Sequence, residues 1–236
     1  MMHMTVAEPQ IAVGLRPVVS ACQTGRKFAQ NWIQQVKVLA LCGMTSTGLF
    51  LSTTAAQASE GVFLASRMTV AAPAGATDLC TTYRWACARA DVAVQISAEQ
   101  LAFAAVLNRQ INRDVRSISD QTQYRRPEHW ALPTSRGGDC EDFALLKKKK
   151  LIEAGVNPQN LLVATVLDRD RNAHAVLVIR TPQGDYVLDN LHNRILHWQS
   201  TGYTFLRMQN PDNPVEWTAV LAGGIIKNDN AVATAR

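Results

Sequence analysis

Three residues of this 236-residue chain have the types and the order that nucleophilic catalysis by a thiol requires. Cys140 lies in GGDCEDFALL, at the predicted start of a helix, where the helix dipole and unpaired backbone N–H groups lower the pKa of a thiol. His174 begins a predicted strand and Asp189 ends the next one. A nucleophilic cysteine needs a base, and the base needs an acceptor that orients it. We therefore predict a catalytic triad of Cys140, His174 and Asp189.

The turn between the two strands decides whether the histidine and the aspartate meet. The runs HAVLVIR and DYVLD flank the sequence TPQG, which predicts an antiparallel hairpin. We expect Thr181 to pair with Gly184 across a two-residue turn. Asp189 then becomes the diagonal neighbour of His174 on the same face of the sheet. A three-residue loop without a bulge would instead place the two side chains on opposite faces.

The surrounding elements predict an α+β domain, because helices come first and an antiparallel sheet follows. A capping box at residues 97–100 opens a helix that reaches to about Val115. A second helix starts at Asp139 as its N-cap and stops at Gly155. Its lysines at 147–150 are predicted to form a solvated face, but one of the four must lie over apolar surface, because four consecutive positions cover most of a helix's circumference. Between these helices we expect a long polar connection. The predicted strands are 161–167, 174–180 and 185–189, with further strands near 203–208 and 217–221.

The N-terminal region predicts export from the cytoplasm. Basic residues precede an apolar run that ends in Ala56-Gln57-Ala58, a small-x-small pattern typical of signal peptidase sites. We predict a signal peptide cleaved near Ala58 and a periplasmic or secreted protein; an uncleaved membrane anchor is the alternative. The predicted organisation is signal peptide 1–58, linker 59–77, catalytic domain 78–226 and disordered tail 227–236.

The charge of the chain does not indicate a nucleic-acid partner. Of the 24 basic and 19 acidic residues, four basic and one acidic residue lie before Ser59, so the remainder carries 20 and 18, a net charge of +2. No basic stripe with interleaved aromatic residues remains, which argues against nucleic-acid binding.

The cysteines fit an oxidising compartment. Cys22 and Cys42 lie in the predicted signal peptide, which leaves three cysteines in the mature chain. Cys80 and Cys87 are close enough in sequence to close a small disulfide loop. Cys140 is then the odd thiol, and an unpaired cysteine in an exported protein is expected to be buried or used.

Two segments resemble a known family. GGDCEDFALLKKKKLIEAG and AHAVLVIRTPQGDYVLDN, with the spacing between them, resemble the bacterial transglutaminase-like cysteine proteinases, which include the periplasmic LapG-type proteases. The resemblance implies a papain/transglutaminase-like cysteine peptidase core, with a helix-borne cysteine packed on an antiparallel sheet that carries the histidine and the aspartate. It assigns the roles of nucleophile, general base and orienting carboxylate to Cys140, His174 and Asp189.

The acids beside the thiol need an explanation, because unpaired carboxylates raise the pKa of a nearby cysteine. One explanation is local: Asp139 caps the helix, while Glu141 and Asp142 point into water. The other is a bound cation, since clustered carboxylates suit Ca²⁺. The resemblance supports the second, because LapG-type proteases depend on calcium through the acids that flank the cysteine. It implies Asp139, Glu141 and Asp142 as Ca²⁺ ligands.

The implied chemistry is acyl transfer through a thioester. The backbone N–H of Cys140 and a second donor would hold the oxyanion. Trp130 N–H is a candidate for that second donor, although we favour an interpretation of this residue as a core or cleft-wall aromatic.

The resemblance implies an exported cysteine endopeptidase acting on a protein substrate. LapG-type members trim large surface adhesins and are controlled by a membrane-bound receptor, so an adhesin substrate and such a regulatory receptor are the implied partners. One alternative is a transglutaminase or amidase that acts on side-chain or cell-wall amides with the same triad. Another is a catalytically idle, calcium-stabilised binding module.

Overall fold

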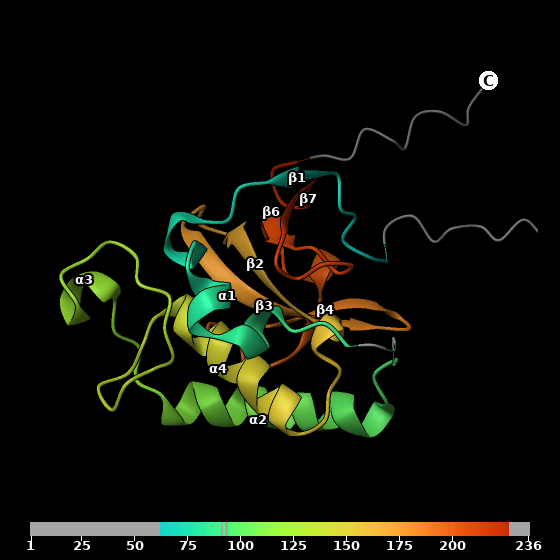
Figure 1. The fold of residues 1–236 in the computed structure, drawn as a ribbon, viewed down its shortest axis with the longest axis horizontal. Coiled ribbons are helices and arrows are strands. Elements are labelled where there is room, and N and C mark those ends of the chain that lie inside the picture. Colours follow the sequence, from blue (N-terminus) through green and yellow to red (C-terminus); the bar gives the residue numbers. More distant parts are fainter. Residues whose placement is uncertain (1–61, 91, 93, 227–236) are drawn as a thin grey trace, which may run out of the picture. The chain divides into compact units, whose positions relative to one another are not determined.

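The computed structural model describes residues 62–90, 92 and 94–226, which form an antiparallel sheet with helices packed on one face (Figure 1). The strands are β1 (Met68–Val70), β2 (Leu161–Leu167), β3 (Ala173–Thr181), β4 (Gly184–Leu188), β5 (Leu196–His197), β6 (Thr204–Gln209) and β7 (Trp217–Ala222). The helices are α1 (Leu79–Thr82), α2 (Ala98–Asp114), α3 (Asp120–Gln123) and α4 (Cys140–Glu153). Single 3-10 turns are η1 (Ala74–Ala76), η2 (Arg84–Cys87), η3 (Pro158–Asn160) and η4 (Trp198–Ser200).

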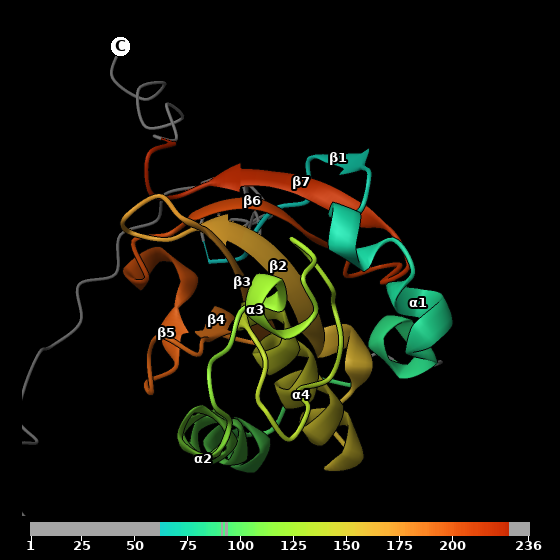
Figure 2. The same cartoon turned by 90° about the vertical axis from the view of Figure 1, so that its left-hand side faces the viewer.

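The sheet is curved and has the strand order β1-β7-β6-β2-β3-β4-β5, with neighbouring strands antiparallel (Figure 2). Helix α4 packs on β3 and β2, and α2 packs on α4 and on β4. Alternate residues of β2 serve two cores. Leu161 and Val163 belong to the core under the helices, whereas Leu162 and Ala164 belong to the core on the other face. The predicted α+β fold is confirmed.

The ends of the two long helices follow local rules, with one exception. Ser97 and Gln100 form the predicted capping box of α2. Gly155, with a φ of +83°, follows the last turn of α4 as a C′ stop. Asp139 occupies the N-cap position of α4, but its side chain makes no capping bond there. It instead accepts a hydrogen bond from the backbone N–H of Asp120, at 3.0 Å.

The lysines of α4 are more deeply buried than predicted, since two of them are enclosed instead of one lying over apolar surface. Lys147 and Lys148 are both fully buried, and only Lys150 of the four is exposed. Lys148 Nζ donates a hydrogen bond to Gln209 Oε1 at 2.7 Å. Hydrophobic periodicity identifies one apolar stripe on a helix, but it does not show how many elements surround that helix. Here β2, β3, α2 and η2 all contact α4, so more of its surface is buried than the stripe alone.

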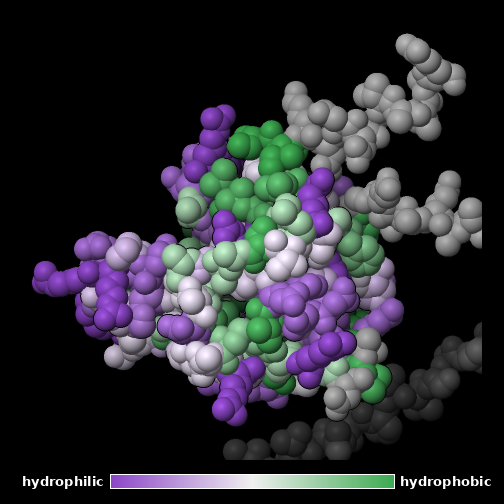
Figure 3. Space-filling view, turned by 45° about the horizontal axis from the view of Figure 1, so that its top comes forward, coloured by the Kyte–Doolittle hydropathy of each residue, from purple (hydrophilic) through white to green (hydrophobic). Residues whose placement is uncertain are grey.

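The connection between α2 and α4 forms a lobe, defined as residues 115–139, that projects from the sheet and contains α3 (Figure 1). Its outer surface is hydrophilic (Figure 3). Its inner side is tied to α4, since Ala131 N donates to Asp142 Oδ1 at 2.9 Å. The long polar connection expected from the sequence therefore carries buried polar residues toward the start of α4.

The predicted linker is wrong from residue 62 onward. Strand β1 pairs with β7, and Leu64 is buried in the core on the open face of the sheet. Leu64 N also donates to Asp185 Oδ2 at 2.8 Å. The small and apolar composition of this segment predicts a flexible connection. In the structure, part of the segment instead pairs with β7 as the edge strand β1. Residues 59–61, the predicted signal peptide and the predicted tail from 227 lie outside the described residues, among which no helix is long and apolar enough to cross a membrane.

Candidate active site

The β3–β4 hairpin has the predicted register. Thr181 pairs with Gly184 across a two-residue turn, and Gly184 adopts a φ of +123° there. Asp189 follows β4 directly, and its Oδ1 lies 2.9 Å from Nε2 of His174. The predicted contact between the histidine and the aspartate is therefore present, and both side chains are buried.

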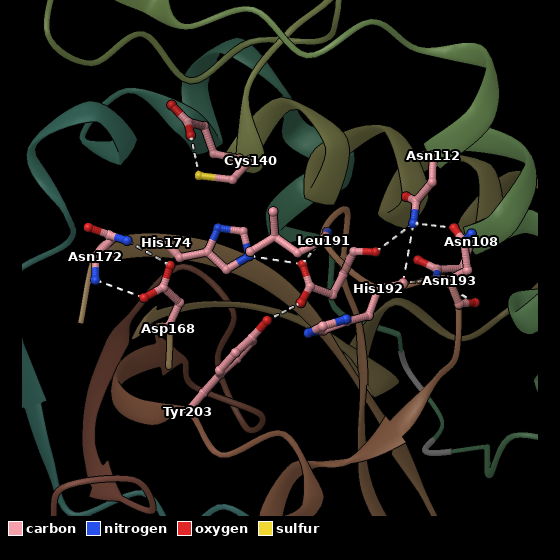
Figure 4. A network of polar contacts seen from close by, with 12 residues as sticks. Asn108, Asn112, Cys140, Asp168, Asn172, His174, Leu191, His192, Asn193 and Tyr203 are labelled. Atoms are coloured by element: carbon pink, nitrogen blue, oxygen red, sulfur yellow. Dashed lines mark hydrogen bonds and ion pairs between the residues drawn. The ribbon is translucent and has the colours of Figure 1, made fainter. Parts of the chain in front are cut away.

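Cys140 is the first residue of α4, and its thiol lies over the imidazole of His174 (Figure 4). Because Nε2 of His174 is bonded to Asp189, Nδ1 is the ring nitrogen left for the thiol. The packing of α4 on β3 brings the thiol close to the imidazole. A cleft of about 290 Å³ contains both side chains. Its lining comprises Pro73, Ala74, Glu128, Trp130, Cys140, Glu141, Thr165, Val166, Ala173, His174, Ala175 and Leu206.

Asp189 is an anion held by several donors. Burial by itself raises the pKa of Asp189, but hydrogen bonds from His174 and Tyr203 outweigh burial and bring the pKa below its usual value. Leu191 N donates to Oδ1 at 2.9 Å, while the Tyr203 hydroxyl donates to Oδ2. Sequence reasoning missed Tyr203, which was predicted only to begin a strand. Tyr203 immediately precedes β6, and β6 joins the sheet next to β2, which in turn pairs with β3. No local sequence motif indicates this strand order.

The thiol of Cys140 is not activated by its immediate surroundings alone. Burial and the charge of Glu141 raise the pKa of Cys140 far above its usual range. The Cys140 thiol also donates a hydrogen bond to Glu141 Oε2 at 3.2 Å. The acid beside the thiol therefore favours the neutral, unreactive form unless its own charge is neutralised.

The acids that flank the thiol do not point into water. Glu141 and Asp142 are 4% and 0% exposed. Burial and the charge of Asp139 raise the pKa of Glu141 to about 9. Burial raises the pKa of Asp142 to about 7. The local explanation offered for these residues is therefore wrong, because the helix start is covered by the lobe that packs against it.

Three of the acids converge on one point. Asp120, Asp139 and Glu141 each offer a carboxylate oxygen, and the three oxygens lie within 4.8 Å of one another. Asp120 was missed by sequence reasoning, since it lies 19 residues before Asp139 in a polar loop. Asp142 is not in this group; its Oδ1 accepts from Ala131 N at 2.9 Å.

This donor set fits a hard divalent cation. Carboxylate oxygens are the ligands that Ca²⁺ prefers. Asp139 Oδ1 and Asp142 Oδ2 are buried, and neither has a hydrogen-bond partner among the described residues. Buried acceptors without donors are costly unless a cation or a proton compensates them.

The remaining predicted site residues lie where the sequence suggested. Cys80 and Cys87 form a disulfide that joins α1 to η2, and Cys140 is free. Trp130 lines the cleft and packs edge-on against Trp217, as expected of a cleft-wall aromatic. Its indole N–H donates to Glu128 Oε2 at 3.2 Å, so its role as an oxyanion donor stays a prediction.

Comparison with known families agrees with this geometry. Residues 66–224 match the bacterial transglutaminase-like cysteine proteinases, BTLCP. The chain belongs to this family. It therefore has the transglutaminase-like fold of a family of cysteine proteinases, and the resemblance seen in the two sequence segments is confirmed.

Solved structures of LapG from Legionella pneumophila are among the similar folds. An EGTA-treated form has 25% identity and a TM-score of 0.42, covering 47% of this chain and 63% of that chain. A second structure has 23% identity and a TM-score of 0.44, covering 55% and 72%. A calcium-bound form has 20% identity and a TM-score of 0.41, covering 55% and 80%. This chain thus spans less than two thirds of the EGTA-treated protein, and comparison with curated proteins found no match.

Proposed function

We propose that this cysteine protease is an exported endopeptidase that uses Cys140, His174 and Asp189 as its catalytic triad to hydrolyse a protein substrate. The observation that carries the proposal is the buried His174–Asp189 hydrogen bond below the thiol, beside a cleft that both Cys140 and His174 line. A thiol, a base and an orienting carboxylate in this order form the arrangement that acyl transfer requires.

The proposed mechanism proceeds through a thioester. His174 accepts the thiol proton at Nδ1, and Cys140 Sγ attacks the carbonyl carbon of the scissile peptide. The backbone N–H of Cys140, at the N-terminus of α4, stabilises the oxyanion. His174 then donates its proton to the leaving amine. Water, deprotonated by the same nitrogen, hydrolyses the thioester and regenerates the thiol.

Calcium is the proposed cofactor. Asp120, Asp139 and Glu141 are the residues whose oxygens would hold it, supported by their convergence and by the unpartnered buried oxygen of Asp139. Bound Ca²⁺ supplies positive charge that offsets the carboxylates next to the thiol. One Legionella LapG structure is described as calcium-bound. Asp142, which the sequence predicts as a ligand, is proposed to lie next to the three ligands and to support them without being one of them.

Export and partners remain part of the proposal. The Cys80–Cys87 disulfide supports an oxidising compartment such as the periplasm, which agrees with the predicted signal peptide. The proposed substrate is a protein, with a large surface adhesin as the specific candidate. A membrane-bound receptor is the proposed regulator. Both come from the family resemblance.

The decisive experiment compares new protein termini on producing cells. Cells that carry the wild-type enzyme should show N-termini on a surface protein that are missing from cells carrying Cys140→Ala, because only peptide hydrolysis creates termini. A matched control is Cys140→Ala complemented by the wild-type gene. Unchanged termini, together with Cys140-dependent attachment of amines to glutamine side chains or release of ammonia, would instead identify a transglutaminase or an amidase.

A further inference from the structure

We infer that Tyr203 and Asn112 are positioning residues that hold Asp189 in place from opposite sides, one through its carboxylate and the other through its backbone. The inference rests on the proposed function, since it assigns these residues to the support of the triad. Neither residue itself lines the cleft.

Tyr203 supports the carboxylate from the sheet. Its hydroxyl donates to Asp189 Oδ2, the oxygen that His174 leaves free, and its side chain is buried. Its ring stands edge-on to the His174 imidazole, with centroids 5.9 Å apart. Burial and the Asp189 charge raise the pKa of Tyr203 well above its usual value, so the hydroxyl remains a donor. One tyrosine thus fixes the aspartate and borders the ring that the aspartate orients.

Asn112 supports the backbone from α2. Its Nδ2 donates to the carbonyl oxygen of Asp189 at 2.8 Å and to that of His192 at 3.2 Å. Asn108, one turn earlier on the same face of α2, donates to the carbonyl oxygens of His192 and Asn193 at 2.9 and 3.2 Å. The two asparagines therefore both hydrogen-bond to the loop after β4, but only Asn112 bonds to Asp189 itself (Figure 4).

These contacts are needed because Asp189 lies just beyond the paired part of β4. The last β3–β4 pair is Leu177 with Leu188, so the ladder does not fix the backbone of Asp189. A carboxylate that orients a base must be held to within about 0.5 Å. With Oδ2 and the carbonyl oxygen both occupied, Oδ1 stays directed at His174 Nε2. The proton then resides on Nε2, and Nδ1 is free to accept the thiol proton.

The first test measures the reactivity of Cys140, which requires no substrate. Full-length protein in calcium-containing buffer is treated with iodoacetamide at neutral pH, and alkylation of the Cys140 peptide is followed by mass spectrometry. Tyr203→Phe should lower the alkylation rate about tenfold, as loss of a hydrogen bond to a charged group implies. The matched control, Tyr186→Phe, removes a hydroxyl from a half-buried ring that packs on His197, and should leave the rate unchanged.

A spectroscopic readout separates positioning from general destabilisation. In protein with ¹⁵N-labelled histidine, the downfield proton of the His174 Nε2–H···Asp189 bond is assigned by its absence in His174→Gln. Tyr203→Phe should shift this resonance upfield and mix the two imidazole tautomers. Tyr186→Phe should leave both features as in the wild type. An unshifted resonance and an unchanged alkylation rate in Tyr203→Phe would overturn the role of Tyr203.

The asparagines supply an internal comparison on one helix. Asn112→Ala should slow Cys140 alkylation roughly fivefold, whereas Asn108→Ala should change it less than about twofold, because only the former loses a bond to Asp189. Equal effects of the two substitutions would show that the loop depends on the hydrogen bonds of both asparagines together, and would overturn the specific role of Asn112.

Failure of the inference can be told apart from failure of the proposed function. If His174→Gln leaves Cys140 as reactive as the wild type does, the triad itself is wrong. If His174→Gln abolishes the reactivity while Tyr203→Phe and Asn112→Ala preserve it, the triad stands and only the positioning roles are refuted.

Discussion

Cys140 has a carboxylate as its hydrogen-bond partner, an unusual neighbour for the proposed nucleophile. Glu141 lies at the next position and accepts from the thiol; Glu141 is buried, and Cys140 is partly buried. The proposed base, His174, is held in place by its hydrogen bond to Asp189. Under the proposed function, positive charge bound at the acids would favour the thiolate form of Cys140.

Calcium should stabilise the protein through the same acids. We expect Ca²⁺ to raise the midpoint of thermal unfolding, since a ligand that binds only the folded state contributes about 2.7 kcal/mol at a hundredfold excess over its Kd. Asp120→Asn should remove most of this increase, because Asp120 is one of the three converging carboxylates. Differential scanning fluorimetry with and without added CaCl₂ measures the effect.

An exposed acid provides the control for this measurement. Asp170 lies in the turn between β2 and β3 and is not one of the converging carboxylates. The Asp170→Asn variant should therefore respond to calcium as the wild type does. An equal calcium response in Asp120→Asn and in the wild type would exclude Asp120 as a ligand.

At the scale of elements, α4 does more than carry the nucleophile. It runs from the acids at its N-terminus to a pair of fully buried lysines and is enclosed on several sides. Lys148 bonds to Gln209, which also accepts from Val163 N and donates to Ala86 O. Lys147 Nζ has no hydrogen-bond partner among the described residues and lies 5.7 Å from the centroid of the Phe143 ring. Buried ammonium groups lower stability unless neighbouring groups compensate them.

The buried lysine predicts a stability that depends on pH. Burial lowers the pKa of Lys148 to about 7, well below that of an unfolded lysine. Between pH 7 and about 10, Lys148 binds more protons in the unfolded chain than in the folded protein. The contribution of Lys148 to the unfolding free energy therefore rises with pH over this range and is lowest below pH 7. Lys148→Met should raise stability at pH 7 on the order of 1–2 kcal/mol and flatten this slope.

Urea unfolding at pH 7 and pH 9 tests the prediction. The control is Lys150→Met, an exposed lysine of the same helix, which should retain the wild-type slope. A Lys148→Met variant that is less stable at pH 7 and keeps the full slope would show that the ammonium contributes net favourable interactions.

Within the described residues as a whole, the sheet links the site to segments far away in sequence. The segment of residues 62–70 crosses from the β3–β4 hairpin to β7, and its strand β1 forms the edge of the sheet there. Arg180 and Asp185 form an ion pair at 2.9 Å, and both contact the backbone of Leu64. The hairpin that carries His174 and precedes Asp189 is therefore anchored at its turn by a segment that precedes it by more than a hundred residues.

Neighbouring residues in this segment should differ sharply in importance. Leu64 is 2% exposed within the core, whereas the adjacent Phe63 is 37% exposed. Leu64→Ala should lower the unfolding free energy by about 2–4 kcal/mol, as large-to-small core substitutions do. Phe63→Ala should cost less than about 1 kcal/mol. Urea denaturation of both variants gives the comparison, and similar losses would mean that Leu64 is not a core residue.

Much of the site could be predicted from the sequence because its decisive features are local. The turn TPQG determines the hairpin register, and hence the contact between His174 and Asp189. The start of α4 places Cys140 at a helix N-terminus, and the spacing of Cys80 and Cys87 permits their disulfide. The family follows from the same local segments.

What the tertiary structure decided involves residues brought together over long chain separations. Asp120 reaches the acids because a polar lobe folds back on α4, and Tyr203 reaches Asp189 because β6 joins the same sheet. The burial of Lys148 depends on how many elements enclose α4. Hydrophobic periodicity and turn chemistry describe a segment and its nearest neighbours in the chain. The charge environment of a thiol is instead set by whatever the fold packs around it.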